Sequence, residues 1–298
     1  MTESRPLLAV AWMMGALASF TGMALAGREL TAEMSVFQAM ALRSVICVTV
    51  LALIAWRVGF RKVTTARFPM HLARSVAHFG GTYAWIFGIS VLPLAAVFSI
   101  EFTTPIWTAL LGAVFLRERL TRWRLAGIAL GFAGILVIVR PGSGLFDVAA
   151  FVVLGAAWCY STVYAFTRAM APTESPLAII FWMNLIQLPL GLVPALGVWV
   201  APSPHAWPWI AVIGIAGLTS HYCVAHAMRH ADAALVAPMD FVRLPLIAVV
   251  GWLFYAEPFN PFVLAGGALI FAGNMTGLWG ERRRRLAAAV SPKRASGS

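Results

Sequence analysis

The sequence has few charged residues and few cysteines, and each shortage excludes a class of protein. Of its 298 residues, 61% are hydrophobic and 11% are charged, whereas a soluble domain carries about 25% charged residues. Because a water-soluble core of this size does not hold so much apolar surface, we expect lipid to be the solvent. Cys47, Cys159 and Cys223 lie in apolar segments and form no CxxC pair. The sequence therefore indicates neither a disulfide framework nor a zinc site.

Motifs that bind nucleotides or metals are also missing. Gly142-Ser143-Gly144 is not followed by the Lys-Ser or Lys-Thr of a phosphate-binding loop. His226 and His230 have i, i+4 spacing but no HExxH motif, and no nucleophile–base set of an intramembrane enzyme is evident. We therefore expect no cofactor, no metal and no enzyme activity.

Ten long apolar runs follow one another along the chain. They cover residues 7–27, 35–56, 70–91, 95–116, 123–140, 146–168, 176–200, 207–229, 234–255 and 261–280. Each is close to the roughly 20 residues that cross a bilayer as a helix, and none shows the alternation over about 10 residues of a membrane strand. The first run is too long for the apolar part of a signal peptide, so we interpret it as a retained helix. We predict an all-α polytopic membrane protein with ten transmembrane helices.

Basic residues are concentrated in alternate loops. Outside the spans, only Arg28 and Arg140 lie on one side of the predicted membrane, and the other Lys and Arg residues lie on the opposite side. Basic loops mark the cytoplasmic side, so we expect a multi-pass inner-membrane protein with both termini in the cytoplasm. This placement explains the net charge of +11 without nucleic acid. Residues 281–298 begin with arginines and continue rich in Ala and Ser, which predicts a basic, disordered cytoplasmic tail.

The two halves of the chain repeat each other, with units at residues 7–140 and 146–280. A shift of 139 residues pairs Glu101 with Asp240, Tyr83 with Tyr222, Gly112 with Gly251, Phe115 with Phe254, Glu118 with Glu257, Gly127 with Gly266 and Gly134 with Gly273. Each unit has five spans, and an odd number inverts the second copy. Inverted repeats are typical of secondary transporters, whose scaffold opens to each side in turn. The alternative is a duplicated bundle without a transport role.

Two motifs resemble one family of membrane proteins. The segment Phe115-Leu116-Arg117-Glu118-Arg119-Leu120-Thr121, followed by Gly127, Gly131 and Gly134, resembles the EamA family of the drug/metabolite transporter superfamily. Phe254-Tyr255-Ala256-Glu257-Pro258, with Gly266 and Gly273, resembles the second EamA repeat. Pro258 and Asn260 replace the basic residues around Glu118, as fits a non-cytoplasmic loop. The resemblance implies ten helices, cytoplasmic termini, a central substrate cavity, and transport of amino acids, vitamins, nucleoside-like compounds or drugs.

Ionisable residues inside the predicted spans are candidate site residues, because burying a charge in a bilayer costs about 2.5–3.5 kcal/mol on insertion scales. They are Arg43, Arg74, His78, Glu101, His221, Asp240 and Arg243. Glu101 and Asp240 are expected on opposite sides of the midplane, and each precedes a proline, Pro105 or Pro245, that frees a carbonyl and permits bending. We expect the acids to flank a central site, with the prolines as hinges. The alternative is static ion pairing of Glu101 with Arg43 or Arg74, and of Asp240 with Arg243.

Aromatic residues and histidines complete the candidate site. Tyr83, Trp85, Trp158, Tyr160 and Tyr222 are expected to line the cavity, where rings stack on a flat or cationic solute. Ordinary helix packing or lipid contact is the alternative for each ring. The histidines have an unperturbed pKa near neutrality and suit proton coupling, with a helix-to-helix hydrogen bond as the other interpretation.

Taken together, these features predict a secondary transporter that works by alternating access. It would move a small organic metabolite (an amino acid, a nucleoside-like or a vitamin-like solute) across the inner membrane. A channel or an intramembrane enzyme without a transport cycle is the alternative. Proton coupling stays open, and so does a homodimer that packs through the glycines of the fifth and tenth spans.

Overall fold

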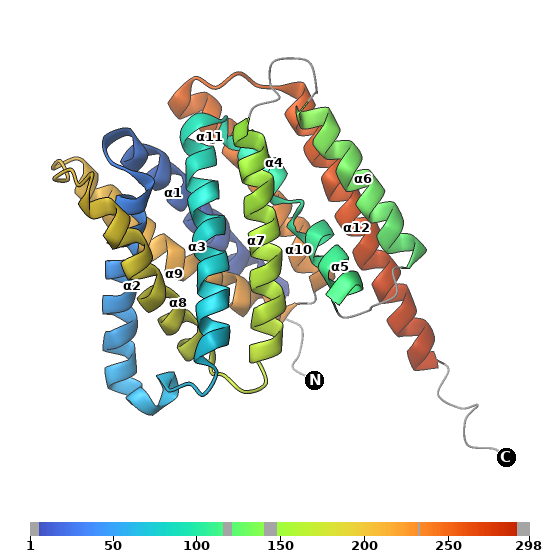
Figure 1. Ribbon diagram of the computed structural model, residues 1–298. Helices are drawn as coiled ribbons and strands as arrows, with labels where there is room; N and C mark the ends of the chain where they lie inside the picture. Colours follow the sequence, from blue (N-terminus) through green and yellow to red (C-terminus); the bar gives the residue numbers. More distant parts are fainter. Residues whose placement is uncertain (1–5, 116–120, 140–147, 232, 291–298) are drawn as a thin grey trace.

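The computed structural model describes residues 6–115, 121–139, 148–231 and 233–290, and this part of the chain forms helices and no strands (Figure 1). The helices are α1 (Pro6–Glu33), α2 (Val36–Val58), η1 (Phe60–Val63), α3 (Phe68–Val91), α4 (Leu94–Glu101), α5 (Thr104–Phe115), α6 (Arg122–Val139), α7 (Val148–Met170), α8 (Pro176–Leu196), α9 (Ala206–His230), α10 (Ala233–Phe241), α11 (Arg243–Tyr255) and α12 (Pro261–Val290). Glu118 and the other residues at 116–120 of its motif lie outside the described residues. The predicted all-α class is confirmed.

Nine segments of the described chain are long and apolar enough to cross a membrane. The remaining predicted span, residues 70–91, corresponds to α3, which has 24 residues. Its polar residues His71, Arg74 and His78 are buried inside the bundle, so a helix that carries these residues can still cross the membrane because other helices cover its polar side.

Two of the predicted spans are each broken into two helices, at equivalent positions of the two repeats. The fourth span divides into α4 and α5 at Phe102 and Thr103, and the ninth divides into α10 and α11 at Val242. Pro105 and Pro245 lie just after the breaks, and a proline cannot donate to the carbonyl four residues earlier. In the first repeat that carbonyl belongs to Glu101, and the Thr104 hydroxyl donates to it at 2.6 Å.

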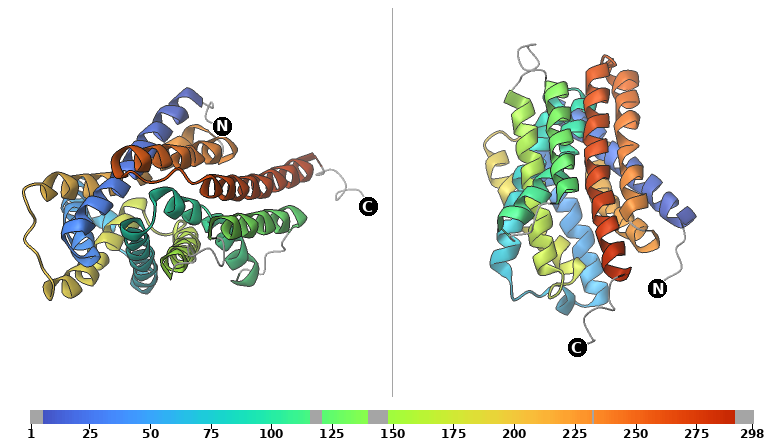
Figure 2. Two further views of the ribbon diagram at one scale, coloured as in Figure 1. Left: turned by 90° about the horizontal axis from the view of Figure 1, so that it is seen from above. Right: turned by 90° about the vertical axis from the view of Figure 1, so that its right-hand side faces the viewer.

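The main helix pairs join one repeat to the other. α1 packs along α9, α3 along α7, α2 along α8 and α6 along α12, while α4 contacts α11 (Figure 2). In the two repeats, α1 is equivalent to α7, α2 to α8, α3 to α9 and α6 to α12. Exchanging the repeats therefore converts the α1–α9 pair into the α7–α3 pair, and it converts the α2–α8 and α6–α12 pairs into themselves. The two repeats are therefore interleaved around a pseudo-twofold axis, and neither is a separate body.

Glycines bring α6 and α12 into backbone contact. A Cβ atom added to Gly127 would lie 2.6 Å from the carbonyl oxygen of Gly273, and one added to Gly134 would lie 2.6 Å from that of Gly266. These glycines are equivalent in the two repeats, and they pack within the chain as small residues do between membrane helices.

The two ends of the described chain lie toward the same end of the bundle. The first turn of α1 and the last turn of α12 are both in the lower part of Figure 1. α12 continues to Val290, so the predicted disordered tail is helical over residues 281–290. Residues 291–298 lie outside the described part.

Candidate functional site

A cluster of charges joins the two helix breaks at the centre of the bundle. Glu101 is the last residue of α4, Asp240 lies in the last turn of α10, and Arg243 begins α11. Nη2 of Arg243 lies 3.4 Å from Oε1 of Glu101 and 3.4 Å from Oδ2 of Asp240. The indole Nε1 of Trp85 on α3 donates to Oε2 of Glu101 at 2.8 Å. One guanidinium thus bridges the equivalent acids of the two repeats.

Aromatic rings surround this guanidinium. Its central carbon lies 4.3 Å from the ring centroid of Phe20, 5.1 Å from that of Phe98 and 4.9 Å from that of Phe102, within the range of cation–π attraction. Phe102 also stacks on Phe241, with ring centroids 4.1 Å apart. Phe102 and Phe241 are repeat mates, and each follows its acid directly in the sequence. The breaks therefore bring equivalent residues of both repeats into contact.

The hydrogen-bonding groups of this cluster are only partly satisfied. Arg243 is 3% exposed and its Nε has no hydrogen-bond partner, and Oδ1 of Asp240 has none. Most buried polar groups in proteins have partners, and an unpaired one costs about 1–3 kcal/mol. The Asp240 side chain is 33% exposed, against 18% for Glu101, so neither acid is fully enclosed.

A second polar cluster lies where α2, α3 and α8 meet. Nη2 of Arg43 donates to Oε1 of Gln187 at 2.8 Å, and the Gln187 amide lies 2.8 Å from Nδ1 of His78. Nε of Arg74 donates to the hydroxyl of Thr167 on α7 at 2.8 Å. Arg43 and Arg74 are 5% and 7% exposed. This cluster holds two cations, and neither forms an ion pair with an acid among the described residues.

Rings from α7 and α9 lie between the two clusters. His221 is within electrostatic range of Arg43, Arg74 and Arg243, and its ring contacts Phe20 at 6.0 Å between centroids. Tyr164 is within electrostatic range of Glu101 and Asp240, and it is 60% exposed. His221 is exposed as well. Tyr164 and His221 thus combine exposed surface with proximity to the charged residues of the two clusters.

The structure brings together some of the predicted site residues and separates others. Glu101, Asp240, Arg243 and Trp85 form the first cluster. Arg43, Arg74 and His78 form the second, with Tyr160 at 5.9 Å from His78 between ring centroids. The predicted pair of Asp240 with Arg243 is present. Glu101 pairs with Arg243 instead of Arg43 or Arg74.

Three of the predicted aromatic residues lie elsewhere. Tyr83 packs against Phe37 of α2 at 4.7 Å between ring centroids. Trp158 packs against Trp107 of α5 at 5.5 Å, and it is 43% exposed. Tyr222 packs against Trp12 and His226 on the α1–α9 pair. Among the described residues, no three His, Cys, Asp or Glu side chains are grouped as metal ligands.

The sequence analysis missed two kinds of residue in these clusters. Gln187 links Arg43 to His78, and its signal was a polar residue inside an apolar run. Phe102 and Phe241 were detectable as a pair, because the 139-residue shift superimposes them beside Glu101 and Asp240. Phe20 carried no such signal, since only the packing of α1 brings it over Arg243.

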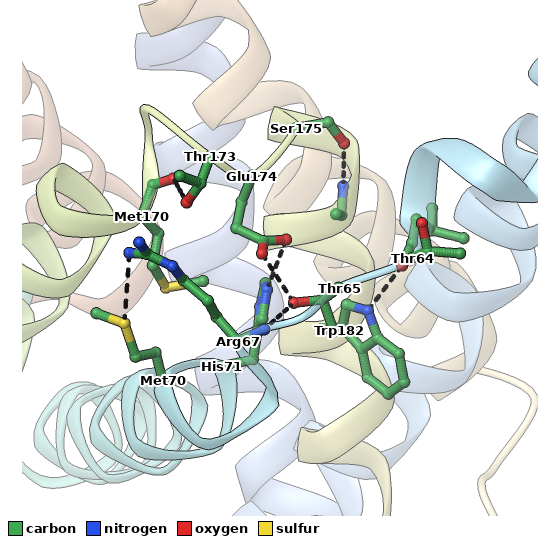
Figure 3. Close-up of polar contacts among 12 residues, drawn as sticks. Thr64, Thr65, Arg67, Met70, His71, Met170, Thr173, Glu174, Ser175 and Trp182 are labelled. Atoms are coloured by element: carbon green, nitrogen blue, oxygen red, sulfur yellow. Dashed lines mark hydrogen bonds and ion pairs between the residues drawn. The ribbon is translucent and has the colours of Figure 1, made fainter.

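At one end of the bundle, the segment between α2 and α3 is held to the segment between α7 and α8 (Figure 3). Oε2 of Glu174 lies 3.2 Å from Nε2 of His71, and the Thr65 hydroxyl donates to Oε1 at 2.9 Å. The Ser175 hydroxyl donates to the carbonyl of Lys62 at 2.6 Å, and Trp182 Nε1 to that of Val63 at 2.8 Å. We call this set the lower clasp; it joins a loop of each repeat.

At the opposite end, Arg28 and Glu257 hold the start of α4. Arg28 forms an ion pair with Glu257 and donates to the carbonyls of Ile89 at 2.8 Å and Leu92 at 2.7 Å. Both carboxylate oxygens of Glu257 accept from the backbone N–H of Leu94, at 3.1 and 3.0 Å. This is a favourable position, because the first N–H groups of a helix lack partners and attract negative charge. We call this set the upper clasp.

An enclosed space beside the upper clasp does not have the chemistry of a polar site. It measures about 250 Å³, lies between α4, α6, α7, α11 and α12, and is lined by apolar residues such as Ala96, Ile138, Ala150 and Val263. Its ionisable lining residue, Glu257, is already bonded to Arg28 and Leu94. The two central clusters therefore remain the candidate functional site.

Known proteins resemble this chain over most of its length. A riboflavin transporter of Brucella anthropi is 27% identical over 225 residues, 74% of this chain and 79% of that protein. An S-adenosylmethionine uptake transporter of Rickettsia felis is 22% identical over 225 residues, 76% of each chain. The pseudopaline exporter CntI of Pseudomonas aeruginosa is 26% identical over 271 residues, 87% of this chain and 92% of that protein.

A solved crystal structure has a TM-score of 0.66 at 19% sequence identity, over 94% of this chain and 99% of that one, which supports the fold. The model of the EamA-like transporter family matches this sequence twice, at residues 7–140 and 147–276. These matches confirm the predicted family, and they make the protein a multi-pass membrane transporter of small metabolites and not an enzyme. The chain belongs to the EamA-like transporter family.

Proposed function

We propose that the chain is a secondary transporter that carries its solute past the helix breaks by alternating access. The observation that carries this proposal is the cluster of Glu101, Asp240 and Arg243 at two equivalent breaks of an inverted repeat. Discontinuous helices near the midplane form the substrate and ion sites of many such transporters. Charges buried in membrane segments are costly and usually functional.

The shared guanidinium supports an exchange of partners during transport. Two acids and one arginine leave one negative charge in excess when all three are ionised. A cationic or hydrogen-bond-donating group of the solute, or a proton, would complete this set. Glu101 and Asp240 face the same arginine from different repeats, so a change in either bond changes how the repeats contact each other at the centre.

The two clasps and the breaks suggest how the chain opens. The lower clasp joins loops of both repeats, and the upper clasp joins α1 and α3 to the loop after α11. In the proposed cycle, one clasp opens while the other stays closed, and α4–α5 and α10–α11 bend at the breaks before Pro105 and Pro245. Such rocking of one repeat against the other is the usual movement of inverted-repeat carriers.

The named relatives support a solute with a ring or several polar groups. They transport riboflavin, S-adenosylmethionine and pseudopaline by name, and we propose an amino acid, a nucleoside-like or a vitamin-like metabolite for this chain. The basic loops support an inner-membrane orientation with both termini in the cytoplasm. Proton coupling through Glu101 or Asp240 and a homodimer are further proposals, each open to direct measurement.

The test is solute-specific counterflow in proteoliposomes. Purified full-length protein is screened for thermal stabilisation by a metabolite panel, and each hit is loaded inside vesicles while its labelled form is supplied outside. A carrier gives saturable, transient accumulation that only related solutes stimulate. Linear, non-saturating flux would make the protein a channel and would refute alternating access.

A further inference from the structure

Arg43 and Arg74 are buried cations that have no acid among the described residues to neutralise them. Their side chains belong to α2 and α3, and they are 5% and 7% exposed. The ion pairs of the described chain involve Arg28, His71, His205 and Arg243, and neither Arg43 nor Arg74 takes part. Because buried charges are normally paired, two unpaired guanidinium groups that act on the same histidines, His78 and His221, require an explanation.

Each guanidinium is anchored at one side and free at another. Arg43 is held by Gln187 and Arg74 by Thr167, each through one hydrogen bond of 2.8 Å. Nε of Arg43 and Nη1 of Arg74 are buried without a partner. The adjacent hydroxyls of Ser44 and Ser75 are also buried and unpaired. Each arginine is therefore held in place by one bond and, together with the serine that follows it in the sequence, keeps donors without a partner.

The described surroundings of this pair do not supply a negative charge. Both arginines act electrostatically on His78 and His221, which are neutral or positive groups. Nδ1 of His78 lies 2.8 Å from the Gln187 amide nitrogen and 3.2 Å from the Thr82 hydroxyl, and neither group carries a negative charge. Glu101 is already bonded to Arg243 and Trp85.

We infer that Arg43 and Arg74 form an anion-binding subsite, and that the transported solute carries a carboxylate or phosphate group which binds between them. A planar guanidinium presents paired donors that match both groups. The opposite end of the solute would lie toward Glu101 and Asp240, where acids outnumber cations. This inference rests on the proposed transport function and specifies the substrate class of that site.

The experiment uses the whole chain and leaves the identity of the solute open at the start. Proteoliposomes that contain the full-length protein are incubated with a bacterial metabolite extract, and mass spectrometry identifies solutes that accumulate above the level in protein-free liposomes. We expect these solutes to carry a carboxylate or a phosphate group. Competition with acetate and with inorganic phosphate then separates the two anions, since the matching one reduces uptake more strongly.

Variants test the two residues directly. R43Q and R74Q should each raise the KM for the identified solute at least about tenfold, because a hydrogen bond to a charged group is lost. R43K keeps the positive charge but loses the paired N–H donors of the guanidinium. Its KM should therefore lie between the KM of R43Q and that of the parent. R57Q is the matched control, since Arg57 is an exposed arginine at the end of the same helix, and it should leave KM unchanged.

The outcomes separate this inference from the proposed function. Accumulation of a solute without an acidic group overturns the anion subsite and leaves the transporter proposal intact. An unchanged KM in R43Q and R74Q, in variants that unfold at the parent temperature, overturns it as well. If the parent protein accumulates nothing above protein-free liposomes, the transport proposal fails and the subsite fails with it.

Discussion

Charged side chains in the two clasps at the ends of the bundle have several bonding partners each, whereas two arginines nearer its centre have few. Arg28 in the upper clasp bonds to Glu257 and to two carbonyls, and Glu174 in the lower clasp accepts from Thr65 and His71. At the centre, Arg43 and Arg74 have one side-chain bond each. The satisfied groups hold segments together, and the unsatisfied groups retain capacity for a ligand.

This difference follows from what each position must do. A loop end held by a complete ion pair loses stability when either partner is removed, because the other stays buried without compensation. A transport site with every group satisfied would gain little from binding a solute. Variants at the ends should therefore lower stability, and variants at the centre should lower transport.

The largest effect is expected at the upper clasp. R28Q leaves Glu257 without its cation, and both side chains are mostly buried, at 17% and 12% exposed. We expect a loss of about 3–5 kcal/mol in the free energy of unfolding, measured by thermal unfolding in detergent. R229Q, which changes an exposed arginine at the end of α9, is the control. Equal unfolding temperatures for R28Q and the parent would contradict the structural role.

The next effect is expected at the centre. E101Q keeps the shape and one acceptor for Trp85 but removes a charge that Arg243 binds. Truncation of a buried hydrogen-bonded charge pair costs about 2 kcal/mol or more, so uptake should fall at least about 30-fold. Membrane levels and the unfolding temperature should stay close to those of the parent. Uptake at the parent rate would remove Glu101 from the mechanism.

A smaller effect on stability is expected at the α6–α12 contact. G134A places a methyl group against the carbonyl of Gly266, and overpacking of this kind costs about 1–3 kcal/mol. The matched control is G155A on α7, where an added Cβ meets nothing within 4 Å and alanine favours the helix. The comparison is made by thermal unfolding. If G134A is as stable as G155A, the backbone contact is not close.

The smallest effect is expected at the lower clasp. T65V removes the bond to Glu174 and the bond that the hydroxyl accepts from the Arg67 N–H, and leaves the bond from His71, so it should cost about 1–2 kcal/mol. T49V, which changes an exposed threonine bonded within its own helix, controls for the lost hydroxyl. A larger change in uptake rate than in unfolding temperature would show that the lower clasp opens during transport.

Much of the architecture was predictable from composition and repetition. The apolar runs predicted the helices because a bilayer requires long segments that satisfy their own backbone. The shared motifs indicated the family that the matches later confirmed. Glu101, Asp240 and Arg243 were predictable as a group, since they are ionisable residues in apolar runs and Arg243 follows Asp240 by one helical turn.

Contacts between distant segments were not predictable in the same way. Arg243 pairs with Glu101 from the other repeat, and Phe20 of α1 covers it. Tyr83 and Tyr222 are repeat mates yet pack against different neighbours, Phe37 and Trp12. The 139-residue shift identifies equivalent positions in the two repeats. The rotation of each helix about its own axis, however, decides which of these side chains face inward.

The sequence by itself determined that this protein is helical, lies in a membrane and contains two inverted copies of one unit, because hydrophobicity, loop charge and internal similarity are properties of the chain. Only the tertiary structure decided which buried charges are paired and which are left with free donors. The physical reason is that an ion pair depends on a few ångströms between helices far apart in sequence, and no local pattern specifies that distance.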